Sequence, residues 1–225
     1  MPGRNIPLVT DQIYHVLNRG VAAQPIFLSK TEYLRAIQTI FYYQNQKTSL
    51  RYSLFLRLPV KEREEFLNKL KAEKKFLVEI LAFCLMPNHF HLLLRQLQDN
   101  GISIFMSNVA NSYTRYFNTK QKRIGPLFQG KFRAVRVETD NQLLHLSRYI
   151  HLNPYSSYVT KTLDGTENYS YSSFPEYLCP EKPSNCTKKI ILHNFKDVLS
   201  YKKFVFDQAD YQRKLQEIKH LALEE

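Results

Sequence analysis

Two histidines separated by a single residue, His89 and His91, are the side chains whose types and spacing most directly suggest chemistry. Alternate side chains of a β-strand point to the same face, roughly 6.5 Å apart, so two imidazoles at this spacing can bind one metal ion. Phe90 and Leu92 would then pack on the opposite face. A His-x-His pair on a strand is more often structural, and two ligands do not complete a coordination sphere. The pair therefore predicts half of a metal site.

A second candidate for chemistry lies on a helix predicted over residues 141–153. Thr139 or Asp140 would cap this helix, and Pro154 would end it. One face of the helix carries side chains at the spacing i, i+3, i+4 and i+7, namely Leu146, Tyr149, Ile150 and Asn153. Taken alone, this spacing favours a core tyrosine whose hydroxyl reaches the edge of the core.

The histidine pair must be positioned by strands. Residues 76–86 are almost continuously apolar, which predicts a central strand buried on both faces. The turn pair Pro87-Asn88 follows, so a second strand would begin at His89. Residues 12–18 are rich in β-branched and aromatic side chains and predict the first strand of the chain. His15 could lie near the histidine pair if these strands are neighbours, although a packed or solvated histidine is the commoner outcome.

Helices are predicted before and after the paired strands. Ser29 is a plausible N-cap, with Glu32 placed for a capping box, for a helix that ends near Gln44. The charge-rich stretch 45–74 is interpreted as a helical insertion with a solvated face. Apolar residues then recur at a helical period over residues 102–120.

The composition indicates a basic protein with room for a sizeable core. The chain has 225 residues, 44% of them hydrophobic, and a net charge of +12, at which nucleic acid is the first partner to consider. Cys84, Cys179 and Cys186 have no metal-type spacing and are odd in number. These cysteines are therefore typical of a protein from a reducing compartment. No stretch reaches the length of a membrane span, and no apolar signal segment opens the chain. We therefore expect a cytoplasmic protein without membrane contact.

Basic and aromatic residues alternate in residues 127–138, which predict a fourth strand. Cations suit phosphates and aromatic rings suit stacked bases, a mixture that single-stranded or hairpin nucleic acid requires. For the cations on the helix over 102–120, a solvated face is an equally good interpretation. The candidate nucleic-acid contacts are Arg19, Arg115, Lys122, Arg123, Lys131, Arg133 and Arg136.

The order strand, helix, strand, strand, helix, strand, helix predicts an α+β fold with a ferredoxin-like split-βαβ sheet. Three blocks lie within it: Pro87-Asn-His-Phe-His-Leu-Leu93, Gly125-Pro-Leu-Phe-Gln-Gly-Lys-Phe132 and Tyr149-Ile-His-Leu-Asn-Pro154. In this order and spacing they resemble the single-tyrosine HUH transposases of insertion sequences, most closely the branch called REP-associated tyrosine transposases. Weaker matches extend the resemblance over roughly residues 12–178.

The resemblance implies a mechanism and a set of site residues. His89 and His91 match the pair that holds a divalent ion, Mg²⁺ or Mn²⁺. Tyr149 matches the catalytic tyrosine, which attacks a DNA phosphate and leaves a 5′-phosphotyrosine link and a free 3′-hydroxyl. Asn153 falls where the family carries a third metal ligand, one helical turn after the tyrosine. The implied activity is cleavage and rejoining of single-stranded DNA at hairpin repeats, without a nucleotide cofactor.

Two alternative activities stay open at this point. The protein could be a domesticated hairpin-DNA-binding protein that does not cut, although binding alone would not require His89, His91 and Tyr149. A replication initiator or relaxase would use the same chemistry but usually presents the tyrosine first along the chain. Zinc hydrolysis lacks the His-Glu-x-x-His motif that would support it.

The resemblance also predicts the organisation of the chain. Residues 1–178 would form the catalytic domain, and residues 179–225 a helical extension that either helps hold DNA or simply packs on the domain. Insertion-sequence relatives swap the tyrosine helix between two subunits, whereas the REP-associated branch can act as a monomer. A monomer or a homodimer is therefore possible, and the monomer is favoured.

Overall fold

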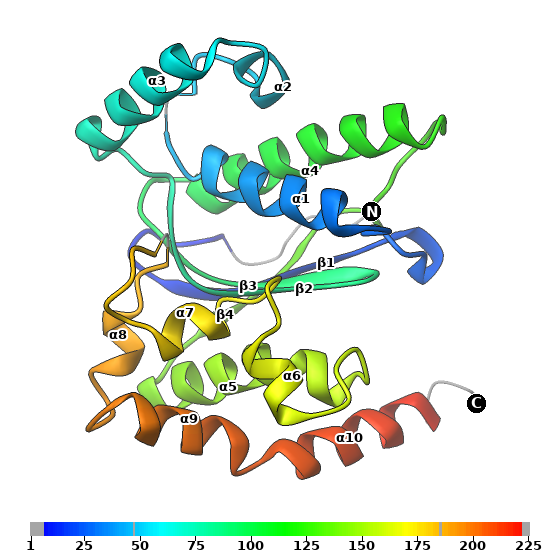
Figure 1. Ribbon diagram of the computed structural model, residues 1–225, viewed down its shortest axis with the longest axis vertical. Coiled ribbons are helices and arrows are strands. Elements are labelled where there is room, and N and C mark those ends of the chain that lie inside the picture. The colour runs from blue at the N-terminus through cyan, green and yellow to red at the C-terminus, as the bar shows by residue number, and fades with distance from the viewer. Residues whose placement is uncertain (1–6, 47, 185, 222–225) are drawn as a thin grey trace.

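The computed structural model describes residues 7–46, 48–184 and 186–221 (Figure 1). Its centre is a four-stranded sheet in the order β2-β3-β1-β4, in which every neighbouring pair is antiparallel. The strands are β1 (Ile13–Arg19), β2 (Val78–Met86), β3 (His89–Gln96) and β4 (Arg133–Val137). β1 and β2 run in the same direction with β3 between them, so the predicted ferredoxin-like split-βαβ sheet is confirmed.

Helices cover both faces of the sheet (Figure 1). One face carries α1 (Lys30–Tyr43), α2 (Tyr52–Phe55), α3 (Val60–Glu73) and α4 (Gly101–Lys120). The other carries α5 (Asp140–Ser156), α6 (Leu163–Glu167), α7 (Phe174–Leu178), α8 (Lys189–Leu192), α9 (Val198–Phe206) and α10 (Ala209–Leu221). None of the helices in the described residues is long and apolar enough to span a membrane.

The alternation predicted for β3 is confirmed. Phe90, Leu92 and Leu94 lie in the core beneath α1 and α4, whereas Leu93 lies in the core shared with α5. His91 has the same parity as Leu93 and is 5% exposed on the α5 side. The packed opposite face therefore fixes the orientation of the histidine pair.

The prediction that residues 76–86 form a central strand is wrong, because β2 is an edge strand. Its outer edge is covered by the chain that follows α6. The amide of Leu85 donates to Tyr171 O (2.9 Å), that of Ser173 to Phe83 O (3.0 Å) and that of Thr187 to Ile80 O (2.9 Å). An apolar edge strand must be shielded from other chains. Burial on both faces does not distinguish a central strand from an edge strand that is shielded in this way.

Helix α5 does not end at Pro154 as predicted but continues to Ser156. A proline in the last turn costs the helix only one backbone donor. The two residues after it are buried, and their packing favours continuation of the helix. The carbonyl of Tyr155, one of the unpaired acceptors at the helix end, accepts from Arg213 Nη2 (2.9 Å). At the other end, Thr139 Oγ1 accepts from the Gln142 amide (3.2 Å), which confirms the predicted cap.

Two further local predictions are wrong. Strand β4 is shorter than residues 127–138, because residues 127–132 form a loop held by the bond from Gln129 N to Arg19 O (2.8 Å). Ser29 is the N-cap residue of α1, as predicted, but its hydroxyl donates to the Glu32 carboxylate and accepts from no helix amide, so only the predicted capping box is wrong. Glu32 is buried and pairs with Lys120 (2.5 Å), so this carboxylate joins α1 to α4.

Residues 186–221 share a core with the sheet. Ile191 of α8 and Tyr201 and Val205 of α9 are buried in the same cluster as Ile150 and Leu152 of α5. The helical part of the predicted extension is therefore observed, and it packs on the helix that carries Tyr149. The domain boundary at 178/179 stays a prediction.

The buried His151 of α5 predicts a stability that depends on pH. Its Nε2 contacts Ser173 Oγ (2.9 Å) and its Nδ1 contacts Tyr201 Oη (2.7 Å). Burial lowers the pKa of His151 from 6.5 to about 3. Between about pH 3 and pH 6.5 the imidazole is protonated in the unfolded chain but neutral in the folded chain. The contribution of the buried, neutral His151 to the free energy of unfolding is therefore complete above pH 6.5 and is lost as the pH falls. At pH 5 the loss for this histidine would be about 2 kcal/mol.

Urea unfolding at pH 7 and pH 5 measures this effect. In His151→Gln, whose amide does not titrate, we expect a smaller difference in the free energy of unfolding between the two pH values. An equal difference in the parent chain and the variant would contradict the assignment to His151.

Candidate active site

The structure brings His89, His91, Tyr149 and Asn153 together in one pocket of about 450 Å³. The ring centroids of His89 and His91 are 4.9 Å apart, and that of Tyr149 is 5.5 Å from His91 with the planes nearly perpendicular. The histidines come from β3 and the other two residues from α5, which packs across β2 and β3. The remaining lining residues are Leu17, Asn18, Arg19, Gln129, Lys131 and Arg133.

Tyr149 borders this pocket because it precedes Ile150, the residue of α5 that is buried in the core. Ile150 is completely buried against the sheet, whereas Tyr149 is half-buried and borders the pocket. Asn153 lies one turn later on the same side, is 3% exposed and bonds to the Tyr149 side chain. The spacing favoured a tyrosine in the core. In the structure Ile150 occupies the core, and Tyr149 lies at its rim.

His15 is a third histidine of the site, although a packed or solvated histidine was expected from the sequence. Its Nε2 lies 2.9 Å from Nδ1 of His91, and the two rings stack with centroids 5.1 Å apart. Its ring is also 6.1 Å from that of Tyr149. The register of β1 on β3 pairs Leu17 with His91, so His15 is the diagonal neighbour of His91 on the same face. Strand parity identifies this face, but only the pairing of β1 with β3 brings the rings together.

Hydrogen bonds orient both predicted metal ligands. Nδ1 of His89 is 2.6 Å from Oδ1 of Asn88, and because an amide oxygen only accepts, this Nδ1 carries the proton. Nδ1 of His91 is held by His15. Nε2 of His91 is buried and has no hydrogen-bond partner among the described residues. Such a partnerless buried atom calls for an explanation, and a metal ion would supply one.

Burial keeps the three histidines neutral at pH 7. Desolvation lowers the pKa of His15 to about 4 and, with a smaller contribution from Arg19, that of His89 to about 4. The pKa of His91 lies well below 6.5 for the same reason, with smaller effects of its charged neighbours. Neutral imidazole is the form that binds metal ions. Burial also raises the pKa of Tyr149, an effect that its bond with Asn153 opposes, so its hydroxyl is protonated at neutral pH.

The donor set fits a divalent ion with two imidazoles and one amide oxygen. Oδ1 of Asn153 accepts from Ser157 Oγ (3.3 Å) and keeps a second lone pair, and neutral oxygen suits Mg²⁺ or Mn²⁺. In the part of the chain that the structure describes, no group of three or more His, Cys, Asp or Glu side chains could hold a metal ion. His15 would not bind the ion itself, because its Nε2 is hydrogen-bonded to Nδ1 of His91; it would instead orient His91.

The predicted DNA-binding cations fall into two groups. Arg19, Lys131 and Arg133 line the pocket and are exposed. The other four lie outside its lining, namely Arg115, Lys122, Arg123 and Arg136. Two of these four are engaged within the protein: Arg123 donates to Asn118 Oδ1 (3.2 Å) and Arg136 to Gln12 Oε1 (2.8 Å). Contact of any of these cations with DNA stays a prediction.

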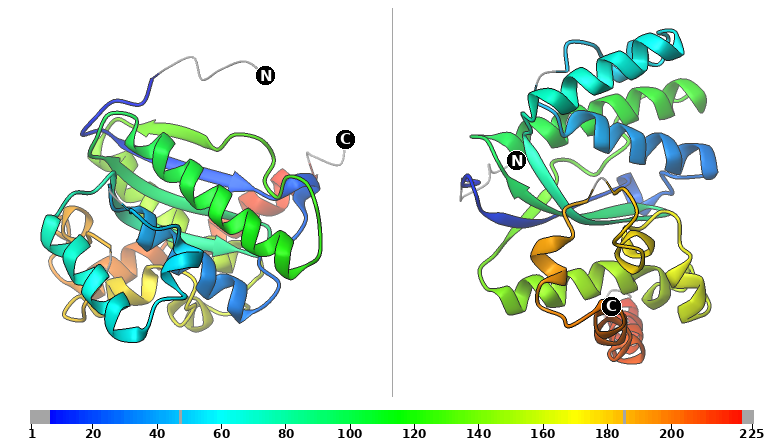
Figure 2. Two further views of the ribbon diagram at one scale, coloured as in Figure 1. Left: turned by 90° about the horizontal axis from the view of Figure 1, so that it is seen from above. Right: turned by 60° about the vertical axis from the view of Figure 1, so that its left-hand side comes forward.

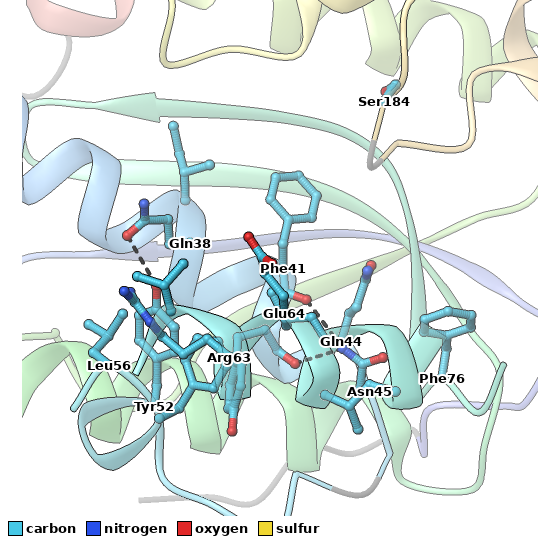
Figure 3. A pocket seen from close by; sticks show the side chains of 16 residues that line it. Gln38, Phe41, Gln44, Asn45, Tyr52, Leu56, Arg63, Glu64, Phe76 and Ser184 are labelled. Carbon is cyan, nitrogen blue, oxygen red and sulfur yellow. Dashed lines mark hydrogen bonds between the residues drawn. The ribbon is translucent and has the colours of Figure 1, made fainter. Parts of the chain in front are cut away.

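Another hollow, of about 700 Å³, lies between α1, α2 and α3 (Figure 3). Aromatic and aliphatic side chains such as Phe41 and Leu56 form most of its lining, and Tyr52 donates to Gln38 Oε1 (3.0 Å) at its wall. None of the predicted site residues borders it. The chemistry of the chain therefore centres on the pocket between the sheet and α5.

Comparisons with known proteins agree with this geometry. The family described as "Transposase IS200 like" matches residues 47–153, a range that includes the histidine pair, Tyr149 and Asn153. Among solved structures, a REP-associated tyrosine transposase bound to a REP hairpin is similar with a TM-score of 0.52 and 13% identity. The match covers 82% of this chain and 89% of that chain, and at this identity it establishes the fold. No curated protein matches the chain.

Proposed function

Because residues 47–153 match the family of IS200-like transposases, we propose that this chain cleaves and rejoins single-stranded DNA through Tyr149. One observation carries the proposal. The Tyr149 ring lies 5.5 Å from His91, beside a buried imidazole nitrogen that no described residue satisfies. A protein that only binds DNA would not require a tyrosine hydroxyl beside two neutral, oriented histidines.

The reaction follows from the position of Tyr149. Its oxygen attacks the scissile phosphorus, and the bond from phosphorus to the 3′-oxygen breaks as the new bond forms. The phenolic proton leaves, and the 3′-oxygen is released as a hydroxyl. The 5′-phosphotyrosine link retains the energy of the broken ester, so the strand can be rejoined without a nucleotide cofactor.

The other pocket residues hold the phosphate and its charge. Arg19, Lys131 and Arg133 border Tyr149 from β1, the 127–132 loop and β4, where their cations would bind the DNA backbone. His89, His91 and Asn153 would hold Mg²⁺ or Mn²⁺, which when bound polarises the scissile phosphate and offsets charge in the transition state. Burial of the hydroxyl keeps Tyr149 protonated until it attacks.

The substrate we propose is a DNA hairpin with a single-stranded flank. Support comes from the net charge of +12 and from the similar REP-associated transposase, which was solved with a REP hairpin. Tyr149 meets the histidines of its own chain, so one copy would hold a complete site and a monomer could act alone. A homodimer with exchanged tyrosine helices is the alternative. We expect the reaction to take place in the cytoplasm.

A denaturing gel tests the proposal. The protein is mixed with labelled single-stranded hairpin DNA from repeats around its own gene, with Mn²⁺ or with EDTA. We expect a slow-moving protein–DNA band in Mn²⁺ that is absent in EDTA. Tight hairpin binding without an adduct or cleavage would instead support the domesticated binding protein.

His15 is expected to tune metal affinity, since it fixes the ring that would bind the ion. Replacing a side chain that orients a metal ligand typically lowers affinity about 10- to 100-fold. We therefore expect His15→Ala to weaken Mn²⁺ binding by about that factor, measured by isothermal titration calorimetry without DNA. His15→Gln, whose amide can still bond to Nδ1 of His91, should recover part of the affinity. Unchanged affinity in His15→Ala would contradict this role.

A further inference from the structure

A groove of about 900 Å³ runs between α4 and the 130–135 segment that contains most of β4. We call it the α4–β4 groove. On the α4 side, Ser103, Ser107 and Asn111 lie four residues apart and so form one row along the helix. Asn111 Nδ2 donates to Ser107 Oγ (3.3 Å) within this row. Lys131 and Arg133 form the opposite wall.

The α4–β4 groove adjoins the pocket of Tyr149 where β1 ends and β4 begins. Asn18, Lys131 and Arg133 line both hollows, so a strand that leaves the pocket past these residues enters the groove directly. Asn18 is 5% exposed and stands at the end of β1, between the two. The two cations are exposed at the same junction. A substrate chain can therefore bridge the two sites without crossing a helix.

The position of β4 leaves this groove open. β4 is an edge strand, and seen from above α4 lies between α1 and β4 (Figure 2, left). None of the described helices covers the outer side of β4 in that view. On the opposite edge of the sheet, β2 is shielded by backbone hydrogen bonds with Tyr171, Ser173 and Thr187. The open edge is thus the one that carries the basic residues.

The lining has the chemistry that single-stranded nucleic acid requires. Cations along one wall suit phosphates, small polar side chains along the other can bond to sugars or base edges, and Ala110 and the exposed Val135 provide apolar surface for bases. Because the three polar residues of α4 are small, they leave room in the groove. These polar residues lie off the apolar stripe of α4. The helical periodicity identifies only that stripe, so it does not predict the groove.

We propose that the α4–β4 groove holds the single-stranded DNA that flanks the scissile phosphate. This inference rests on the proposed function for the identity of the ligand, and it adds a binding surface formed by Ser103, Ser107 and Asn111 of α4. The hairpin stem lies outside the groove, and the single-stranded flank passes from the pocket across Asn18 into it.

A negative charge introduced into the groove tests the proposal. Ser107 is exposed on α4, so Ser107→Glu adds a negative charge without burying it, and Asn111→Glu serves as a second variant. Ser53→Glu is the matched control, because Ser53 is exposed on α2 and borders neither hollow. Fluorescence anisotropy measures binding to two DNAs, a hairpin with a long single-stranded flank and the same hairpin without it.

We expect both groove variants to bind the flanked hairpin about tenfold more weakly and the flank-free hairpin with an affinity within about twofold of the parent chain. Ser53→Glu should change neither. A photo-crosslinking amino acid at position 111 should attach to the flank, and labels on its two sides would show which side occupies the groove. Unchanged affinity in both groove variants, or an equal loss on both DNAs, would overturn the proposal.

The two proposals fail in different ways. If the parent chain binds the flank through Ser107 and Asn111 but forms no adduct, the transposase chemistry fails and the groove stands. If adducts form normally and both groove variants bind flanked DNA like the parent chain, the chemistry stands and the groove fails.

Discussion

Tyr149→Phe is expected to form no covalent adduct with single-stranded DNA and to cleave none, a loss of at least about 1,000-fold. The change removes only the oxygen that would attack phosphorus. The ring stays half-buried beside His91, so the fold and the binding of hairpin DNA should be retained. Denaturing gels with labelled hairpin DNA and Mn²⁺ measure the adduct, and anisotropy measures binding.

Tyr155→Phe is the matched control for this variant. Tyr155 lies on the same helix, but its hydroxyl donates to Asp210 (3.1 Å) and it does not line the pocket. Its adduct yield should equal that of the parent chain. Cleavage that survives Tyr149→Phe would assign the nucleophile elsewhere, for example to water, and would refute the tyrosine mechanism.

His91→Ala is expected to abolish Mn²⁺ binding that can be measured at millimolar ion, and adduct formation with it. His91 is the proposed ligand whose Nε2 has no hydrogen-bond partner among the described residues, and its Nδ1 is already held by His15. Removing it takes away one of two imidazoles, and Asn153 contributes only a neutral oxygen. Isothermal titration calorimetry with Mn²⁺ alone measures the loss independently of cleavage.

His193→Ala serves as the control for this loss, because His193 is exposed and outside the pocket. It should bind Mn²⁺ like the parent chain. Hairpin binding in EDTA should be similar for both variants, since the cations that we propose to bind phosphate are unchanged. A parent-like Mn²⁺ affinity in His91→Ala would show that the ion, if it binds, lies elsewhere.

Local periodicity was enough to predict much of this fold. A period of two placed His89 and His91 on one face of β3 and Phe90 on the other, and a helical period placed Tyr149 and Asn153 together on α5. These patterns are readable because burial selects apolar residues at each repeat of the backbone. The three sequence blocks also indicated a resemblance to the transposases, and residues 47–153 match the family described as "Transposase IS200 like".

Pairing between distant segments was beyond those patterns. The strand over 76–86 was predicted to be central, but it is an edge strand that Tyr171, Ser173 and Thr187 shield. An apolar run looks the same in both cases. Likewise, Pro154 was predicted to end α5, but contacts from α10 stabilise the last turn. In each case a contact far along the chain overrides a local signal.

The sequence by itself determined the types of the candidate site residues, the faces on which they lie and the family that the chain resembles. Only the tertiary structure decided that His15 contacts His91, that Tyr149 packs against His91, and that α4 and β4 enclose a groove beside them. Periodicity reports which face of an element is buried. It carries no information about the register of one strand on another, and these three features depend on how separate elements pack together.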